Sequence, residues 1–359
     1  MLCRVYLKNY VYFCFLLSYL GLIMLMTSLF IIPKVDSISV DYKENFSIVV
    51  LPDTQYYSDN YSSIFENQTN WIIENKESMN IVFVTHLGDL VDHYESIAEW
   101  NNANISMSKL ENLPFGVLPG NHDGAEDGGD LANFNNYFGF NRFGNESWYG
   151  GAYQNINTNS YQLFSAGEND FIIFHIQFNP SDDVLFWASE VIDKYPSKRV
   201  IVSTHDFVHG YYYYSNSRSK IGENIWEKLV KPHADQIFLV LSGHYENEVR
   251  ITSLEDGYFV HQLLSDYQDR PNGGNGWLRI IKFSSINDEI SIKTYSPYLN
   301  QYETDSNSQF ILDKKITESK FMLLSILPII IPLVIILLVG YFLFRIIRKI
   351  KTSSIQKTV

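Results

Sequence analysis

The chain has 359 residues, and 46% of them are hydrophobic, which is enough to build the core of one large domain or two small ones. All 40 acidic residues lie between two apolar stretches at 10–32 and 321–344, whereas seven of the 27 basic residues lie outside that region. The region between the stretches therefore carries 20 basic against 40 acidic residues, a charge of −20, which argues against nucleic acid as its main partner.

The first apolar stretch, residues 10–32, is long enough to cross a bilayer and is preceded by Arg4 and Lys8. Residues 1–36 are therefore predicted to be either a cleaved signal peptide or a retained signal anchor. An apolar run of this length exceeds the core of an ordinary signal peptide, which favours retention. The only cysteines, Cys3 and Cys14, lie in or before this stretch, so the rest of the chain has no disulfide.

Residues 37–318 are predicted to form one domain, in which short apolar runs alternate with longer helical patterns, as is typical of α/β folds. Strands are predicted, in chain order, at 47–51, 81–85, 115–118, 170–177, 199–204, 237–242, 257–264, 277–283 and 289–295. Helices are predicted at 62–76, 96–110, 131–138, 181–194 and 221–230. Because the last third of the domain is rich in strands, we expect mixed rather than uniformly parallel sheets.

The second apolar stretch is followed by a basic tail, 345–359, which the positive-inside rule places in the cytoplasm. Residues 319–344 are thus predicted to be a transmembrane helix, and the domain between the two spans is expected on the extracytoplasmic side of the cell membrane. Five Asn-X-Ser/Thr sequons fall in that region and are a weak indication of a glycoprotein: Asn45, Asn60, Asn67, Asn104 and Asn145.

Polar residues of the metal-ligand type directly follow five of the predicted strands: Asp53, Asp89, Asn121 with His122, His205, and His244. Groups at the carboxyl ends of strands converge on one crevice in an α/β sheet, so we expect these residues to meet there together with Gln55, Asp92 and Glu246. Carboxylates, imidazoles and amide oxygens suit Mn, Fe, Zn or Mg, and there are too many of them for one ion. Two divalent ions can hold a phosphoryl group and activate a bridging water, which indicates phosphoester hydrolysis.

These residues stand in motifs that resemble, in order and rough spacing, those of the calcineurin-like metallophosphoesterase superfamily. The motifs are Asp53-Thr54-Gln55, Gly88-Asp89-Leu90-Val91-Asp92, Gly120-Asn121-His122-Asp123, the single His205, and Gly243-His244-Tyr245-Glu246. The resemblance spans roughly residues 46–300. It implies a four-layer α/β sandwich, with two mixed β-sheets flanked by helices, and a phosphatase or phosphodiesterase that uses two metal ions.

The resemblance also implies roles for individual residues. Asp53 and Gln55 would bind the first metal, Asp89 would bridge the two ions, and the second metal would be completed by three further ligands: Asn121, His205 and His244. His122 resembles the catalytic histidine of the superfamily, which binds a phosphate oxygen or protonates the leaving group, and Asp92 would orient it.

Two positions depart from the commonest pattern of the superfamily, which has histidines where this chain has Gln55 and Glu246. With these residues as ligands the first site becomes an all-oxygen site, for which we expect a weaker preference for zinc and better binding of Mn, Mg or Ca. The alternatives are a first site that is weak because Glu246 points elsewhere, or a catalytically degenerate binding module on the same fold. The segment Gly273-Gly274-Asn275-Gly276, with Asp266 and Tyr267 just before it, is predicted to be a loop near the mouth of the site, without an assigned chemical role.

Overall fold

The computed structural model describes residues 45–125, 129–210, 217–284, 287 and 289–312, together with 340, 341 and 345. The predicted N-terminal stretch lies outside these ranges, and so do the predicted C-terminal helix and tail except for the three isolated positions. Within the described ranges, no helix has the length and apolarity needed to cross a bilayer. The predicted spans therefore remain predictions.

One mixed sheet of seven strands contains the first three and the last four strands, in the order β13-β12-β11-β1-β2-β3 with β14 also paired to β12. Its strands are β1 (Asn45–Leu51), β2 (Ile81–His86), β3 (Phe115–Gly116), β11 (Leu278–Ser284), β12 (Glu289–Ser296), β13 (Gln301–Glu303) and β14 (Gln309–Leu312). The pairs of β1 with β2 and of β2 with β3 are parallel, and the remaining pairs are antiparallel.

The second mixed sheet has the order β4-β5-β6-β7-β8-β10-β9 and is built from the middle of the chain. Its strands are β4 (Tyr149–Ala152), β5 (Asn159–Ala166), β6 (Asn169–Ile176), β7 (Arg199–Thr204), β8 (Ile237–Ser242), β9 (Asn247–Glu255) and β10 (Tyr258–Asp266). Four neighbouring strands, β6, β7, β8 and β10, run parallel to one another, so their carboxyl ends share one edge of the sheet.

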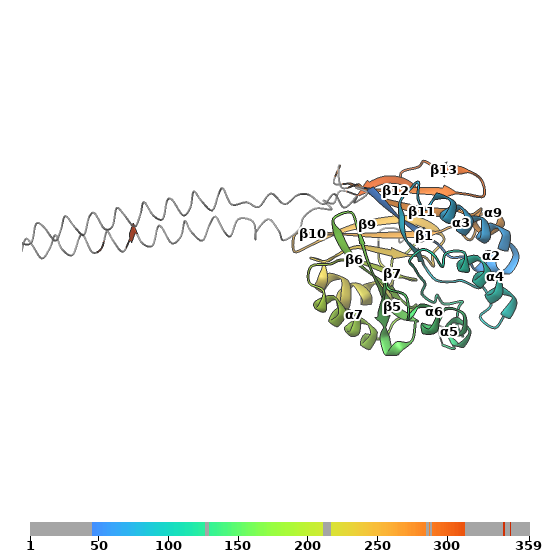
Figure 1. Ribbon diagram of the computed structural model, residues 1–359, viewed down its shortest axis with the longest axis horizontal. Helices are drawn as coiled ribbons and strands as arrows, with labels where there is room; N and C mark the ends of the chain where they lie inside the picture. Colours follow the sequence, from blue (N-terminus) through green and yellow to red (C-terminus); the bar gives the residue numbers. More distant parts are fainter. Residues whose placement is uncertain are drawn as a thin grey trace, which may run out of the picture. The chain divides into compact units, whose positions relative to one another are not determined.

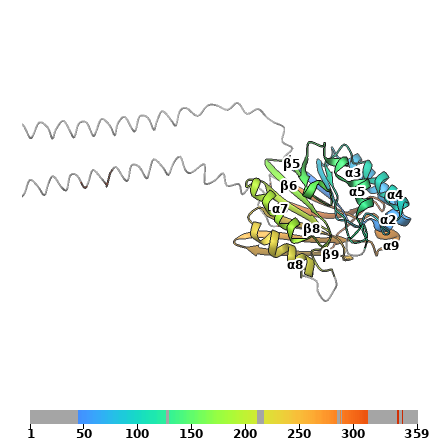
Figure 2. The ribbon, with the colours of Figure 1, turned by 90° about the horizontal axis from the view of Figure 1, so that it is seen from below.

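Helices cover the outer face of each sheet, as Figures 1 and 2 show. On the side of the first sheet lie α2 (Gln55–Asn60), α3 (Ser62–Asn75), α4 (Ile97–Ser108), α5 (Ala132–Phe138), α6 (Phe140–Phe143) and α9 (Pro271–Gly274). On the side of the second sheet lie α7 (Asp182–Lys194) and α8 (Lys220–Ile225), which continues into a π-turn (Trp226–Val230) and a 3-10 turn (Lys231–His233). A further 3-10 turn spans Tyr153–Asn155.

The core is divided into three apolar layers because both faces of each sheet are covered. Side chains of β1 alternate: Phe46 and Ile48 point between the sheets, whereas Val49 and Leu51 point toward the helices of the first sheet. This alternation follows from the two-residue period of a strand. The helix α7 buries one apolar stripe against the second sheet, and a fully buried side chain of this kind contributes about 1.5 to 3 kcal/mol.

The architecture agrees with the expected α/β fold of two mixed sheets with helices. All nine predicted strands and all five predicted helices are present, although β3 is only two residues long and the last predicted helix changes to a π-turn after Ile225. Five strands were missed, namely β4, β5, β9, β13 and β14, and three short helices, α2, α6 and α9. Most of the missed strands lie at or near sheet edges and are half exposed, so they lack a continuous apolar run.

Candidate metal and catalytic site

The five predicted ligand segments do meet, because they follow strands whose carboxyl ends face one another across the two sheets. Asp89 and His244 both have φ in the left-handed region, at 51° and 74°. Non-glycine residues seldom adopt this conformation, and loops that carry functional residues are one of the places where it occurs. Gly88, with φ of 97°, turns the chain sharply before Asp89, and a Cβ atom there would lie 2.9 Å from the backbone nitrogen of Gly120.

His205 is the centre of one cluster of ligand-type atoms. Its Nε2 atom lies 3.2 Å from Oδ2 of Asp89 and 2.9 Å from Oδ1 of Asn121, and its ring centroid is 4.9 Å from that of His244. One ligand atom each from Asp89, His205 and His244 lie within 4.8 Å of one another. Two imidazoles, a carboxylate and an amide oxygen are a donor set that fits Zn, Fe or Mn.

The protein orients the His205 ring in the way that a metal ligand requires. Its Nδ1–H donates to the carbonyl of Leu87 at 2.9 Å, so Nε2 is the atom turned toward Asp89 and Asn121. Burial lowers the pKa of His205, but attraction to Asp89 and Asp53 outweighs burial and raises this pKa to about 10. A cation bound in this position would replace the second ring proton, a linkage typical of metal sites.

Asp53 lies against the loop that carries His244. Its Oδ2 accepts a hydrogen bond from the backbone N–H of His244 at 3.0 Å, and a Cβ atom at Gly243 would lie 2.0 Å from its Oδ1. Burial and the neighbouring carboxylate of Asp266 raise the pKa of Asp53 well above its ordinary value. The Oδ1 atom is buried and has no hydrogen-bond donor among the described residues. A divalent cation fits such an orphaned oxygen.

His122, Asp92 and Gln55 form a hydrogen-bonded series beside this cluster. His122 Nδ1 lies 3.0 Å from the backbone oxygen of Asp92 and 3.2 Å from its Oδ1, and both atoms are acceptors, so Nδ1 carries the proton. Oδ1 of Asp92 also accepts from Nε2 of Gln55 at 3.2 Å. The His122 side chain is 39% exposed, and its backbone N–H donates to Oδ1 of Asp89. This places a reachable imidazole next to the ligand cluster.

The predicted ligand Glu246 is exposed, and Nε2 of Gln268 donates a long hydrogen bond of 3.5 Å to its Oε1. Burial raises the pKa of Asp266, and the charge of Glu246 adds to this effect, so Glu246 lies near Asp266. Asp266 ends β10 and Gln268 lies just after it. Both are buried, and sequence reasoning gave them no role. The missed signal is their position: Asp266 ends a strand parallel to the one that precedes His244. The predicted strand stopped at 264 and hid this relation.

Asp123 is a further residue whose role only the structure reveals. Its Oδ1 accepts from the backbone N–H groups of Leu90 and Val91, at 2.9 and 3.1 Å, and its Oδ2 accepts from Gly120 N–H at 2.8 Å. The carboxylate is fully buried. It therefore ties the loop that carries Asp89 to the loop that carries His122.

Two further buried histidines support the site without facing it as ligands. His86 Nε2 lies 3.0 Å from Oγ1 of Thr54, and its Nδ1 accepts from Gly88 N–H. His175 lies between the sheets, with Nδ1 2.6 Å from Oε1 of Gln162 and Nε2 2.9 Å from Oγ1 of Thr85. Burial lowers the pKa of each to about 3, so both rings are neutral.

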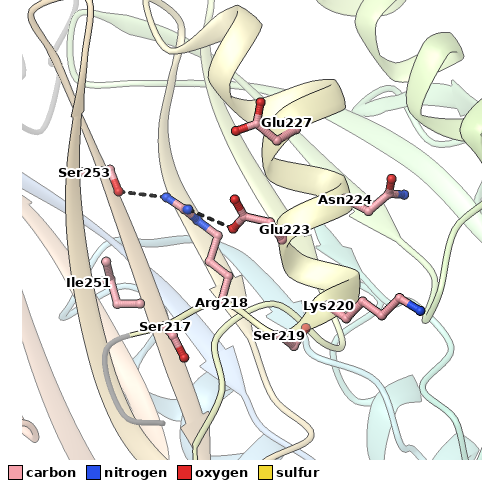
Figure 3. A pocket seen from close by; sticks show the side chains of 9 residues that line it. All are labelled: Ser217, Arg218, Ser219, Lys220, Glu223, Asn224, Glu227, Ile251 and Ser253. Atoms are coloured by element: carbon pink, nitrogen blue, oxygen red, sulfur yellow. Dashed lines mark hydrogen bonds and ion pairs between the residues drawn. The ribbon is translucent and has the colours of Figure 1, made fainter.

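A separate surface pocket lies between β9 and α8 and is shown in Figure 3. Arg218 crosses it and is held by Oε1 of Gln262, Oε2 of Glu223 and Oγ of Ser253, at 2.9 to 3.0 Å, while it stacks on the ring of Trp226. Ser253 lies six residues along β9 from Asn247, on the order of 20 Å from the end of the strand beside Asp266. Since its donors already bind protein acceptors, Arg218 is a structural clamp.

Comparison with known proteins identifies relatives of the chain. The family model described as calcineurin-like phosphoesterase matches residues 46–245. The chain is 40% identical over 276 residues to the uncharacterized protein YvnB of Bacillus subtilis (strain 168), an alignment that covers 74% of this chain and 21% of YvnB. The chain thus spans about a fifth of the length of that relative.

Two of the similar solved structures are phosphatases. One is the purple acid phosphatase PPD1 from seeds of yellow lupin (Lupinus luteus), with 14% identity, a TM-score of 0.49, and coverage of 74% of this chain and 53% of that one. The other is a dimetal phosphatase from Danio rerio, with 12% identity, a TM-score of 0.49, and coverage of 75% and 99%. Similarity at this level carries no conclusion about activity.

Proposed function

Because the chain belongs to the calcineurin-like phosphoesterase family, we propose that it hydrolyses phosphoesters at a dinuclear metal centre with His122 as its catalytic histidine. The observation that supports this proposal best is the cluster of Asp89, His205 and His244, whose ligand atoms lie within 4.8 Å of one another beside the His122–Asp92 pair. A binding module would not need an imidazole poised by a carboxylate next to its metal ligands.

Asn121, His205 and His244 would hold the second ion, Asp89 would be shared, and Asp53 with Gln55 would contribute to the first. When bound, two divalent ions polarise the phosphoryl group and lower the pKa of a water that attacks it. Mn, Fe, Zn and Mg are the candidates that these donor types support.

His122 would bind a phosphate oxygen or protonate the leaving group through Nε2. Its Nδ1–H is directed at Asp92, which fixes the ring orientation and leaves Nε2 free of this contact. Gln55 in turn holds Asp92 through its amide N–H, so the orientation of His122 depends on a residue of the first metal site. This series lets occupancy of that site influence the catalytic histidine.

We further propose that the chain is anchored in the cell membrane with this site on the extracytoplasmic side. The support is the pair of apolar stretches and the basic tail at 345–359. Protease added to intact cells that express the chain should remove the catalytic domain. If the domain is protected in intact cells and cleaved only after lysis, the proposed orientation is wrong.

The activity is tested on the full chain, purified in mild detergent and stripped of metal. p-Nitrophenyl phosphate and its bis-ester are assayed with Mn, Zn, Mg, Ca and Fe, and the variants Asp89→Asn and His122→Ala are assayed beside the wild type. We expect metal to restore turnover in the wild type only, with a loss of about 100-fold or more in His122→Ala from general acid catalysis alone.

Turnover that is equal in the wild type and both variants would contradict the proposed site. If no ion supports turnover of either ester while metal still binds, the degenerate binding module becomes the better account. The observation that favours that alternative is the replacement of two histidine positions of the superfamily by Gln55 and Glu246.

A further inference from the structure

A second set of oxygen atoms converges on Asp53 from a part of the chain more than 200 residues away. The strands β8 and β10 are parallel, with Leu264 paired to Ser242, so two residues further along Asp266 reaches the same edge of the sheet as His244. Of the charged side chains around Asp53, Asp266 exerts the strongest electrostatic effect. Because the His244 N–H also binds Asp53, the strand register and this electrostatic effect both indicate that the two carboxylates are neighbours.

Four buried oxygen atoms at this place have no hydrogen-bond donor among the described residues: Asp53 Oδ1, Gln55 Oε1, Asp266 Oδ2 and Gln268 Oε1. The side chains that carry them are between 1% and 8% exposed. An acceptor buried without a donor costs about 1 to 3 kcal/mol, so four of them in one place need an explanation.

In each of the four side chains the other polar atom has a protein partner, which settles how the side chain is turned. Oδ2 of Asp53 accepts from His244 N–H, and Oδ1 of Asp266 accepts from Gln268 N–H at 3.0 Å. The amide nitrogen of Gln55 donates to Asp92, and that of Gln268 lies 3.5 Å from a carboxylate oxygen of Glu246. A carboxylate only accepts hydrogen bonds, so the amide nitrogen of each glutamine faces the carboxylate and the amide oxygen points away from it.

The segment that follows Gln268 is fastened to the helix that begins at Gln55. The Gly276 N–H donates to the hydroxyl of Tyr57 at 2.9 Å, and a Cβ atom at Gly274 would lie 2.4 Å from that hydroxyl. The helices α2 and α9 pack together here. This contact brings the start of α2, where Gln55 lies, next to the segment that follows β10.

We propose that Asp266 and Gln268 are ligands of the first metal ion, which they enclose with Asp53 and Gln55 in a site of oxygen atoms only. This inference rests on the proposed dinuclear centre, and it assigns the ion to Asp266 and Gln268 in place of Glu246, which is exposed and lies 3.5 Å from Nε2 of Gln268. Two carboxylates and two amide oxygens form a hard donor set, which suits Ca, Mg or Mn better than zinc. The two ions of the centre would then differ in kind.

The test is a calorimetric titration of the metal-free full chain in detergent and 0.15 M salt, with Ca²⁺ and Zn²⁺ as separate probes. In the wild type we expect one equivalent of Ca²⁺ at the oxygen site and one tight equivalent of Zn²⁺ at the His205–His244 cluster. Asp266→Asn should weaken Ca²⁺ binding about 100-fold or more, because changing even an outer partner of a metal ligand lowers metal affinity about 10- to 100-fold. The same variant should still bind the tight equivalent of Zn²⁺.

Asp269→Asn is the matched control, since Asp269 is an exposed carboxylate in the same segment, and it should bind both ions as the wild type does. Circular dichroism without metal checks that Asp266→Asn is folded. If it is not folded, the test uses Gln268→Met, which keeps the size of the side chain and removes the amide oxygen. This variant should weaken Ca²⁺ binding about 10-fold. Unchanged Ca²⁺ binding in the folded variant, or no Ca²⁺ equivalent in the wild type, overturns the assignment. Binding is read without turnover, so an inactive protein that binds both ions would refute the hydrolase and leave the metal site standing.

Discussion

Asp123 offers a direct test of how the catalytic loops are held. Its carboxylate accepts three backbone N–H bonds of 2.8 to 3.1 Å, and the side chain is fully buried. Replacing it with alanine leaves three donors without an acceptor. Burial raises the pKa of Asp123 to about 7, so the loss is worked from the donors and not from its charge. A buried donor without an acceptor costs about 1 to 3 kcal/mol, so after partial relaxation we expect Asp123→Ala to cost about 4 to 6 kcal/mol, a large share of the usual stability of a domain.

The variant Asp123→Asn removes the negative charge of the side chain and keeps its size and shape. The amide oxygen can keep the two bonds from Leu90 and Val91, whereas the amide nitrogen then faces the N–H of Gly120, so one bond becomes a contact between two donors. We expect a loss of about 2 to 3 kcal/mol. Metal affinity should fall in parallel, because the carboxylate joins the loops of Asp89 and His122.

The assay is urea unfolding of the full chain in detergent at pH 7 with a chelator present, so that bound metal does not add to stability. Asp130→Asn is the matched control, since Asp130 is exposed and accepts a single bond from Ala132 N–H, and its variant should stay within about 0.5 kcal/mol of the wild type. The reasoning is refuted if Asp123→Asn is as stable as the control.

Three further outcomes are expected. Gly243→Ala places a Cβ atom 2.0 Å from Oδ1 of Asp53, so mass spectrometry of the purified protein should find one metal equivalent fewer; full occupancy would contradict the contact. Burial lowers the pKa of His175 to about 3 in the folded state. Below pH 6.5 the unfolded state therefore binds a proton that the folded state does not bind. The free energy of unfolding therefore falls as pH falls. Between pH 7 and 5 the free energy of unfolding of His175→Gln should decrease by about 2 kcal/mol less than that of the wild type. An equal decrease would show that the ring is protonated when folded. Chelation should lower the melting temperature, since an ion at 100 times its dissociation constant adds about 2.7 kcal/mol, and an unchanged melt would mean that no ion is bound.

The sequence by itself determined the elements and the types of residue that follow them. Buried strands such as β7 and β8 are continuous apolar runs, and the strands predicted for them have the observed bounds. Because a ligand that follows a strand is set by the local chain, Asp53, Asp89, His205 and His244 could be placed at the carboxyl ends before the sheets were known. The half-exposed strand β9 carries no such signal and was missed.

Only the tertiary structure decided which atoms meet. Asp53 and His244 are 191 residues apart, and their hydrogen bond depends on how the two sheets pack. The same packing turns Gln55 toward Asp92, leaves Glu246 exposed and buries Asp266 at the strand edge where His244 lies. Sequence motifs report residue types at strand ends, whereas side-chain partners depend on strand order and on the pairing register, which local patterns do not encode. The oxygen atoms around Asp53 could therefore be recognised as one set only after the chain had been folded.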